Sequence, residues 1–291
     1  MLVHFVGIGK MGLPMAGHLH AGGYQLTVSD LSASQCVVAK RQGLAVASEC
    51  SAAINKADVI FSSLPNDAAL ALLTQEILGV ARPETIFVDT STVSMQVSAQ
   101  CAQLLERAGI DYLRTTVSGN NKMAEEGKLT IMASGPRVAF DKVQPLLACF
   151  GPNQFYLGVG EQARLMKLVV NLMIAQTSSM LAEGLALGRK GGLGWRDMWR
   201  VLEASAVGSP ILKAKAVQLS ERDFAPTFSV EQMVKDLGLI LDAAGELHSS
   251  VPQTALTYQL MHAAIAQGDG HEDYASIVKV VERISGLDTC V

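Results

Sequence analysis

The sequence predicts an α/β fold in which a doubly wound, mostly parallel sheet is followed by an all-helical C-terminal domain. Two observations favour this class. Strand-like and helix-like patterns alternate as far as residue 161, and only helical patterns follow Gly191-Gly192. We therefore predict an N-terminal domain over residues 1–161 and a C-terminal domain over residues 162–291, which begins with a long helix.

Length and composition exclude several classes of protein. A chain of 291 residues is long for a single core and indicates two domains. Hydrophobic residues make up 49% of it, which argues against disorder, and a net charge of −4 without a basic run argues against nucleic acid as a partner. Scattered cysteines without a C-x-x-C pair are typical of free thiols in a reducing compartment; they are Cys36, Cys50, Cys101, Cys149 and Cys290.

Several other signals are absent from the sequence. The chain enters a strand pattern at once, without a charged leader, and no uninterrupted apolar run is long enough to span a bilayer, so we expect a soluble cytoplasmic protein without a membrane partner. The histidines form no ligand pattern, so no metal is predicted. The lack of a G-x-S-x-G turn argues against a hydrolase.

The first 30 residues carry the most specific local pattern. A strand over residues 2–8 runs into Gly7-Ile8-Gly9-Lys10-Met11-Gly12, a G-x-G-x-x-G turn that opens a helical pattern. A second strand over residues 24–29 ends at Asp30, 18 positions after Gly12. Strand, glycine turn, helix, strand and terminal acid together distinguish a Rossmann-type dinucleotide site from an ordinary turn.

Each residue type in this pattern has a physical reason. Gly7 allows the tight turn, Gly9 lets the backbone approach a pyrophosphate, and Gly12 permits close packing of helix on strand. The phosphates then lie at the helix N-terminus, where unpaired N–H groups and the helix dipole favour an anion. Asp30 would accept hydrogen bonds from an adenosine ribose, and its charge would repel a 2′-phosphate. We therefore predict NAD as the cofactor, with NADP as the other candidate.

The alternation continues through the N-terminal domain. Strands are predicted at residues 44–47, 59–64, 85–89, 112–117, 129–134 and 154–157, and helices at 32–41, 51–55, 93–108 and 137–149, with one more from the Leu64-Pro65 break to about Leu78. Ligands of open parallel sheets lie outside the carboxyl ends of the strands, where Gly9, Asp30, Pro65 and Thr92 all fall. Taken alone, Pro65 and Thr92 also fit ordinary turn and cap chemistry.

The long helical pattern Gln162–Lys190 carries two polar residues on one face. Lys167 and Asn171 are four positions apart, and the rest of the segment is rich in Leu, Val, Met and Ala. Buried polar groups need partners or a cavity. Either Lys167 extends to water and Asn171 bonds a neighbouring loop, or both face a site. Only helices are predicted beyond it, at residues 195–204, 211–219, 232–247, 253–267 and 274–284.

These motifs resemble those of the β-hydroxyacid dehydrogenase family, which includes 3-hydroxyisobutyrate dehydrogenases, tartronate semialdehyde reductases and glyoxylate/succinic semialdehyde reductases. The resemblance covers nearly the whole chain. It rests on the fingerprint from Gly7 to Ala16, on Asp89-Thr90-Ser91-Thr92-Val93, on Val117-Ser118-Gly119, on Lys167 with Asn171, and on Phe228 with Lys235-Asp236.

The resemblance implies a role for each matching position. Lys167 would be the catalytic acid or base, Asp236 would hold the lysines in place, and Phe228 belongs to a segment that closes over the site. The residues implied to hold the substrate are Ser118, Gly119 and Asn171, and the backbone N–H groups of the Ser118-Gly119-Asn120 turn can bind a carboxylate. Those implied to contact the cofactor, in addition to the glycine turn and Asp30, are Leu64, Pro65, Thr92 and Lys235.

Two departures from the family pattern concern the substrate more than the reaction. Arg114-Thr115-Thr116 stands where the family usually has Asp-Ala-Pro, so a charge is reversed and a turn is expected to loosen. Arg114 is either a cationic contact for a more anionic substrate or a surface arginine on a strand. Glu161-Gln162-Ala163 fills the usual place of a Gly-x-Gly, and Gly158 and Gly160 lie further upstream.

The sequence therefore predicts an oxidoreductase of the EC 1.1.1 class, assembled as a homodimer or homotetramer. It would transfer a hydride between a nicotinamide cofactor and a small β-hydroxy acid or aldehyde acid, with Lys167 as general acid/base. Residues 118–127 look closest to the glyoxylate/succinic semialdehyde reductases. Two alternatives remain: an imine reductase on the same scaffold, whose members usually lack the lysine, and a non-catalytic dinucleotide-binding protein.

Overall fold

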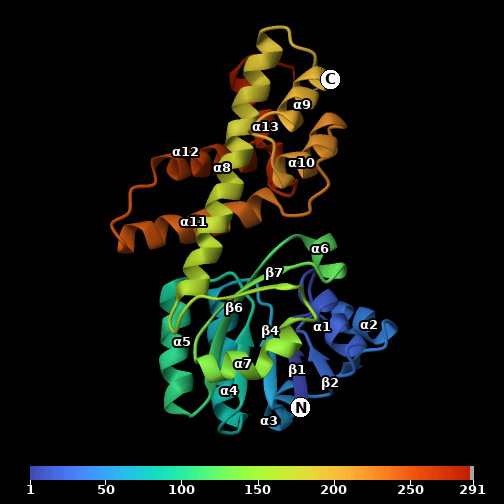
Figure 1. Ribbon diagram of the computed structural model, residues 1–291, viewed down its shortest axis with the longest axis vertical. Helices are drawn as coiled ribbons and strands as arrows, with labels where there is room; N and C mark the ends of the chain where they lie inside the picture. The colour runs from blue at the N-terminus through green and yellow to red at the C-terminus, as the bar shows by residue number, and fades with distance from the viewer. Residues whose placement is uncertain (289–291) are drawn as a thin grey trace. The chain divides into compact units, whose positions relative to one another are not determined.

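The computed structural model describes residues 1–288, which fall into two compact units (Figure 1). The first is Met1–Lys167 and the second begins at Leu168. The division lies six residues beyond the predicted start of the second domain, because the first residues of the long helix pack into the first unit. Ala163 and Arg164 of that helix are almost completely buried there.

The first unit is built on one eight-stranded sheet in the order β3-β2-β1-β4-β5-β6-β7-β8. Neighbouring strands are parallel except β6 and β7, which are antiparallel. The predicted doubly wound, mostly parallel sheet is confirmed, and its first part has the Rossmann order 3-2-1-4-5-6. The strands are β1 (Leu2–Val6), β2 (Gln25–Ser29), β3 (Ala45–Val46), β4 (Val59–Ser62), β5 (Ile86–Asp89), β6 (Asp111–Ser118), β7 (Thr130–Ser134) and β8 (Asn153–Tyr156).

Helices cover both faces of this sheet, as two separate hydrophobic clusters show. One cluster joins α1, α2 and α7 to the sheet through residues such as Phe61, and the other joins α3, α4 and α5 through residues such as Ile60. Successive residues of a strand point to opposite faces, so β4 contributes to both cores. The helices are α1 (Gly12–Ala21), α2 (Ala33–Arg41), α3 (Cys50–Lys56), α4 (Asp67–Val80), α5 (Met95–Arg107), α6 (Asn121–Glu125) and α7 (Arg137–Leu147).

Every helix or strand that the structure describes in the second unit is a helix, which confirms the predicted all-helical region. Two fully buried acids hold it together: Asp273 is ion-paired with Lys215, and Glu282 with both Arg189 and Arg222. Its elements are the continuation of α8 (Gln162–Lys190), then α9 (Trp195–Ala204), α10 (Pro210–Ser220), α11 (Val230–Glu246), α12 (Pro252–Ala266), the 3₁₀ turn Tyr274–Ser276 and α13 (Ile277–Ile284).

Helix α8 meets the length and composition expected of a membrane span, with a mean hydropathy of 1.3 over its most apolar window. Our sequence prediction required an uninterrupted apolar run and therefore excluded it. One such helix is weak evidence for a span, since core helices of soluble proteins meet the same criterion. The thiols Cys36, Cys50, Cys101 and Cys149 are free, and Cys290 lies outside the described residues.

Candidate functional site

The glycine turn leaves β1 where the strand order reverses, between β2 and β4. Gly7 has a φ of +85°, and a Cβ atom there would lie 2.4 Å from the carbonyl oxygen of Ser63. A Cβ atom on Gly12 would lie 1.9 Å from the carbonyl oxygen of Gly7. Nothing lies within 4 Å of the corresponding position on Gly9. Only glycine fits at Gly7 and Gly12, whereas Gly9 presents open backbone to a ligand.

Asp30 follows β2, and its carboxylate is held beside this turn by two backbone groups. The N–H of Ile8 donates to Oδ2 at 2.9 Å, and the N–H of Ser32 donates to Oδ1 at 2.8 Å. A carboxylate has about four acceptor positions, so both oxygens retain capacity for a ligand hydroxyl. No side chain caps the N-terminus of α1. The N–H of Leu13 already donates to the carbonyl oxygen of Gly9 at 3.0 Å, and Pro14 has no N–H. Within the first turn the N–H of Gly12 is therefore the one left for an anion. The turn and Asp30 together fit a dinucleotide.

The loops after β4 and β5 are tied to each other. The backbone N–H of Leu64 donates to the hydroxyl of Ser91 at 2.8 Å. Capping in this region is done by neighbours of the predicted residues, since Asn66 caps α4 and Ser94 caps α5. Pro65 and Thr92 are therefore not the N-cap residues of α4 and α5, and both follow the carboxyl ends of adjacent parallel strands.

The predicted substrate segment leaves the end of β6. Ser118 is its last residue and is half-buried. Gly119 has a φ of +141°, and a Cβ atom there would lie 2.7 Å from the side chain of Leu129. The carbonyl oxygen of the Asn120 side chain accepts the N–H of Met123 at 3.0 Å and caps the short helix α6. The amide nitrogen of Asn120 and one lone pair of its oxygen are then left for a ligand.

Arg114 is not a surface arginine, so that interpretation of the sequence is wrong. Its side chain is 8% exposed and pairs with Glu161, whose Oε1 accepts from Nε at 2.7 Å. Its guanidinium also lies over the ring of Tyr112, 4.8 Å from the centroid. Arg114 and Glu161, which belong to the two departures from the family pattern, therefore neutralise each other's charge. A buried charge needs such a partner.

Arg164 forms a buried centre that sequence reasoning missed. It is almost completely buried on α8 and pairs with Asp89, the last residue of β5. The guanidinium also donates to the Tyr112 hydroxyl at 2.8 Å and to the Ser98 hydroxyl at 3.2 Å. Burial raises the pKa of Tyr112 although the neighbouring Arg164 guanidinium lowers it, so the hydroxyl stays protonated. An arginine on an apolar helix was the available signal, but its partners lie 52 to 75 positions away.

Lys167 is the last residue of the first unit and is half-buried. It lies about one helical turn after Arg164, whose guanidinium bonds Asp89 at the carboxyl end of β5. The expected loosening by Thr116 is not seen, because β6 runs unbroken through it and its hydroxyl donates to the carbonyl oxygen of Ala163 at 2.9 Å.

Within the second unit, Asn171 bonds a helix rather than the neighbouring loop considered from the sequence. Its Nδ2 donates to Oδ2 of buried Asp236 at 2.5 Å, and Nζ of Lys235 lies 2.8 Å from Oδ1 of the same carboxylate. Asp236 thus joins Asn171 to Lys235. Phe228 is half-buried and packs edge-on against Tyr274, whose N–H donates to the Phe228 carbonyl oxygen at 2.9 Å.

Comparison with known families and proteins agrees with this geometry. The family model of the NAD binding domain of 6-phosphogluconate dehydrogenase matches residues 2–158. The model described as NAD-binding of NADP-dependent 3-hydroxyisobutyrate dehydrogenase matches residues 161–281. The chain belongs to the β-hydroxyacid dehydrogenase family. It is accordingly an NAD(P)-dependent oxidoreductase that acts on a CH–OH group.

Individual relatives span nearly the whole chain. A 2-(hydroxymethyl)glutarate dehydrogenase of Eubacterium barkeri is 32% identical over 98% of this chain and 96% of its own length. Glyoxylate/succinic semialdehyde reductase 1 of Arabidopsis thaliana is 29% identical over 97% of this chain and 99% of its own. The solved structure of a Mycobacterium tuberculosis 3-hydroxyisobutyrate dehydrogenase with L-serine has a TM-score of 0.87 at 26% identity, covering 97% and 99% of the two chains.

Proposed function

We propose that the protein transfers a hydride between a nicotinamide coenzyme and a small β-hydroxy acid or aldehyde acid, with Lys167 as general acid/base. One observation carries the proposal. Arg164, one turn before Lys167, is bonded to the carboxyl end of β5, at the edge of the sheet that also bears the glycine turn and Ser118. An amine, a carboxylate-binding turn and a dinucleotide turn thus belong to one compact unit.

The side chains have chemically distinct tasks. The hydroxyl of Ser118 and the backbone N–H groups that follow it bind the substrate carboxylate. In reduction the ammonium of Lys167 donates a hydrogen bond to the carbonyl oxygen and then its proton; in oxidation the neutral amine accepts that proton. Asp236 accepts from Nδ2 of Asn171, which leaves the amide oxygen of Asn171 for a substrate hydroxyl. The nicotinamide supplies or takes up the hydride when bound.

The names of the relatives support a narrower substrate class. 2-(Hydroxymethyl)glutarate, 3-hydroxyisobutyrate and L-serine all carry a carboxylate and a primary alcohol, whereas glyoxylate and succinic semialdehyde carry a carboxylate and an aldehyde. We therefore propose that the protein interconverts a primary alcohol and an aldehyde on a short carboxylic acid. The absorbance of NADH and NADPH tests this with these five acids in the matching direction. Turnover of a cyclic imine alone, or tight coenzyme binding without any turnover, would overturn the proposal.

Coenzyme choice is proposed to depend on the Asp30 carboxylate, whose charge favours NAD over NADP. We expect Asp30→Asn to raise KM for NAD by roughly tenfold to a hundredfold, since a hydrogen bond to a charged group contributes about 1.5–3 kcal/mol. KM for NADP should rise less, because the repulsion of the 2′-phosphate is also removed. Initial rates with both coenzymes measure the ratio.

Asp58→Asn is the matched control for Asp30. Asp58 also accepts a backbone N–H, from Leu2 at 2.8 Å, but it lies before β4, at the opposite edge of the sheet. Its replacement should leave both KM values unchanged. An unaltered NAD to NADP ratio in Asp30→Asn would remove Asp30 from coenzyme selection.

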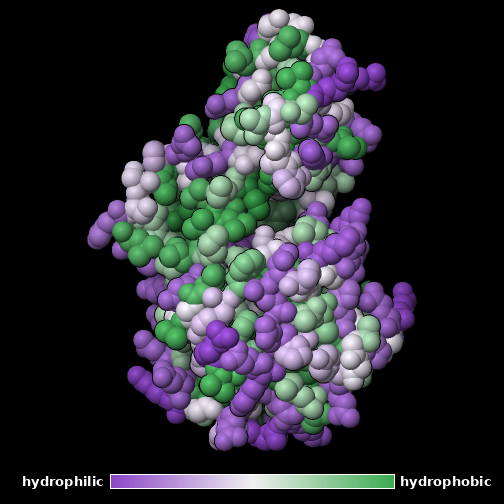
Figure 2. Space-filling model, in the orientation of Figure 1, coloured by the Kyte–Doolittle hydropathy of each residue, from purple (hydrophilic) through white to green (hydrophobic). Residues whose placement is uncertain are grey.

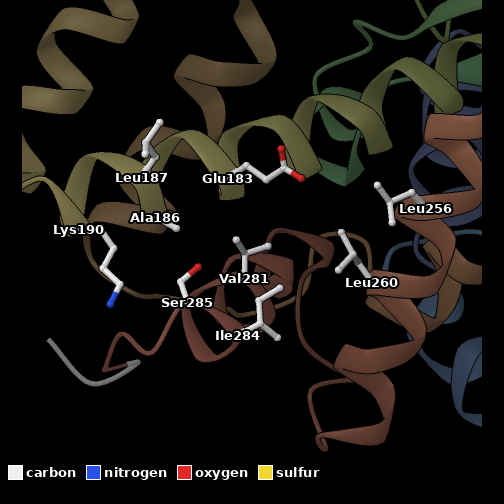
Figure 3. Close-up of a pocket in the computed structure, with 9 residues that line it drawn as sticks. All are labelled: Glu183, Ala186, Leu187, Lys190, Leu256, Leu260, Val281, Ile284 and Ser285. Carbon is white, nitrogen blue, oxygen red and sulfur yellow. The ribbon is translucent and has the colours of Figure 1, made fainter.

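A groove on the second unit is a different kind of surface, because none of the predicted site residues lines it. Its volume is about 560 Å³, and Figure 3 shows the apolar side chains around it. Leu187 is 76% exposed and Ile284 is 69% exposed. Figure 2 shows apolar residues gathered over the second unit. The lining residues are Glu183, Ala186, Leu187, Lys190, Leu256, Leu260, Val281, Ile284 and Ser285.

We propose that a second copy of the chain packs on this groove about a twofold axis. Glu183 and Lys190 are seven positions apart, so they lie two turns apart on one face of α8. Within residues 1–288 neither side chain forms an ion pair. A twofold axis between them brings Glu183 of each copy against Lys190 of the other, as an isologous interface requires.

Charge reversal tests this pairing. Glu183→Lys alone and Lys190→Glu alone should each halve the mass of the assembly, because like charges then meet twice across the axis. The double variant should restore the mass, measured by light scattering after gel filtration. Leu72→Glu, at an exposed position of α4, is the control and should leave the mass unchanged. A monomeric natural protein, or a double variant that stays dissociated, would contradict the proposal.

A further inference from the structure

The first turn of α8 is held on both backbone groups of one residue, Ala163. Its N–H donates to the hydroxyl oxygen of Ser134 on β7 at 3.1 Å. Its carbonyl oxygen accepts from the hydroxyl of Thr116 on β6 at 2.9 Å. Ala163, Thr116 and Ser134 are all fully buried, so water does not compete for these bonds. Strands β6 and β7 therefore both hydrogen-bond to the backbone of the same residue of α8.

This point is directly connected to Lys167. In an α-helix the N–H of a residue donates to the carbonyl oxygen four positions earlier, so the oxygen of Ala163 is also the acceptor for Lys167. A carbonyl oxygen has two lone pairs and can accept both donors. One oxygen atom thus joins the hydroxyl of Thr116 to the backbone of Lys167.

We propose that Thr116 is a positioning residue for Lys167, an inference that rests on the proposed catalytic role of that lysine. A lysine side chain is long and flexible, so the place of its ammonium depends on where its backbone is fixed. The family pattern that this segment resembles usually has proline at this position, and proline has no hydroxyl with which to make the bond. Threonine at position 116, which was expected to loosen the turn, therefore adds a hydrogen bond that holds the start of α8.

The chain offers a closely matched pair of variants. Thr116→Val keeps the shape of the side chain and removes only the hydroxyl, which bonds Ala163 at 2.9 Å and lies 3.4 Å from the carbonyl oxygen of Met132. Thr115→Val makes the same change one position earlier, where the threonine is equally buried but its hydroxyl has no hydrogen-bond partner within residues 1–288. Both variants remain β-branched and suit a strand.

Hydrogen–deuterium exchange of the protein without coenzyme gives a readout that does not depend on activity. In Thr116→Val the peptide containing Lys167 should exchange roughly twofold to tenfold faster, as expected for the loss of one hydrogen bond. In Thr115→Val its exchange should not change. Equal exchange in the two variants would overturn the proposal, whatever substrate the protein uses.

Steady-state kinetics then connect position to turnover. Thr116→Val should lower kcat by roughly tenfold with little change in the Kd for NADH, since small displacements of a reacting group are costly. Thr115→Val should keep kcat within about twofold of the natural protein. If Lys167→Met retains full activity, the proposed function has failed; if it is inactive while Thr116→Val behaves like Thr115→Val, only the positioning role has failed.

Discussion

Lys167→Met is expected to lower kcat by roughly 10²- to 10⁴-fold, the usual contribution of a general acid or base. Methionine fills nearly the same volume but neither donates nor accepts the proton. Lys167 is not part of the glycine turn that is proposed to bind the coenzyme, so the Kd for NADH should change by less than about threefold. Stopped-flow or steady-state absorbance of NADH measures kcat, and fluorescence titration measures the Kd for NADH.

The pH dependence of the two directions provides an independent check on Lys167. Reduction needs the ammonium form and oxidation needs the neutral amine, so raising the pH should slow the former and speed the latter. In Lys167→Met both the fall in the reduction rate and the rise in the oxidation rate with pH should disappear. Lys142→Met, an exposed lysine on α7, is the control and should retain the natural profile. A variant at Lys167 with natural kcat would show that another group moves the proton.

Arg164→Met should lower the free energy of unfolding by about 3–5 kcal/mol, because it leaves the Asp89 carboxylate buried without its cation. We expect this loss to be larger than that of any other variant proposed above. Asp89 would still accept from the hydroxyls of Ser62 and Ser91, each at 2.5 Å, which offsets only part of the loss. We expect Tm to fall by roughly 6–20 °C, at about 2–4 °C for each kcal/mol in a chain of this size. Calorimetry or circular dichroism would show it.

Two further variants separate the lost ion pair from other effects. Arg164→Met with Asp89→Asn removes both charges and should recover a large part of Tm, because burying a neutral amide costs less than burying a carboxylate. Arg137→Met breaks an ion pair with Asp141 whose side chains are 61% and 51% exposed, and it should change stability by less than about 1 kcal/mol. A loss in Arg164→Met no larger than in Arg137→Met would disprove the buried role.

Local patterns were sufficient to predict most of the first unit. The glycine turn and Asp30 form a contiguous motif, and strands such as β4 and β5 are short apolar runs between turn residues. Helix α6 was missed because five residues are too few to show a helical period, and its cap at Asn120 resembles an ordinary polar loop. The antiparallel pairing of β6 with β7 depends on tertiary packing rather than on any residue within either strand.

The buried charges could not be predicted because their partners are distant in sequence. Arg114 and Glu161 are 47 positions apart, and each was interpreted alone. A signal was nevertheless present, since two departures of opposite charge from one family pattern suggest that the residues meet. Arg164 had no such signal, because its acceptors come from α5, β5, β6 and the loop after β5. A contiguous motif is visible in the sequence, whereas a charge network of residues that are distant in sequence is not.

The unbroken course of α8 past the division between the two units has an evolutionary consequence. Lys167 ends the first unit and Asn171 belongs to the second, yet one helix carries both, so their spacing is set by helical geometry alone. Losing a single residue between them would rotate one by about 100° relative to the other. Length changes among descendants of this protein should therefore collect in the loops and spare residues 168–170.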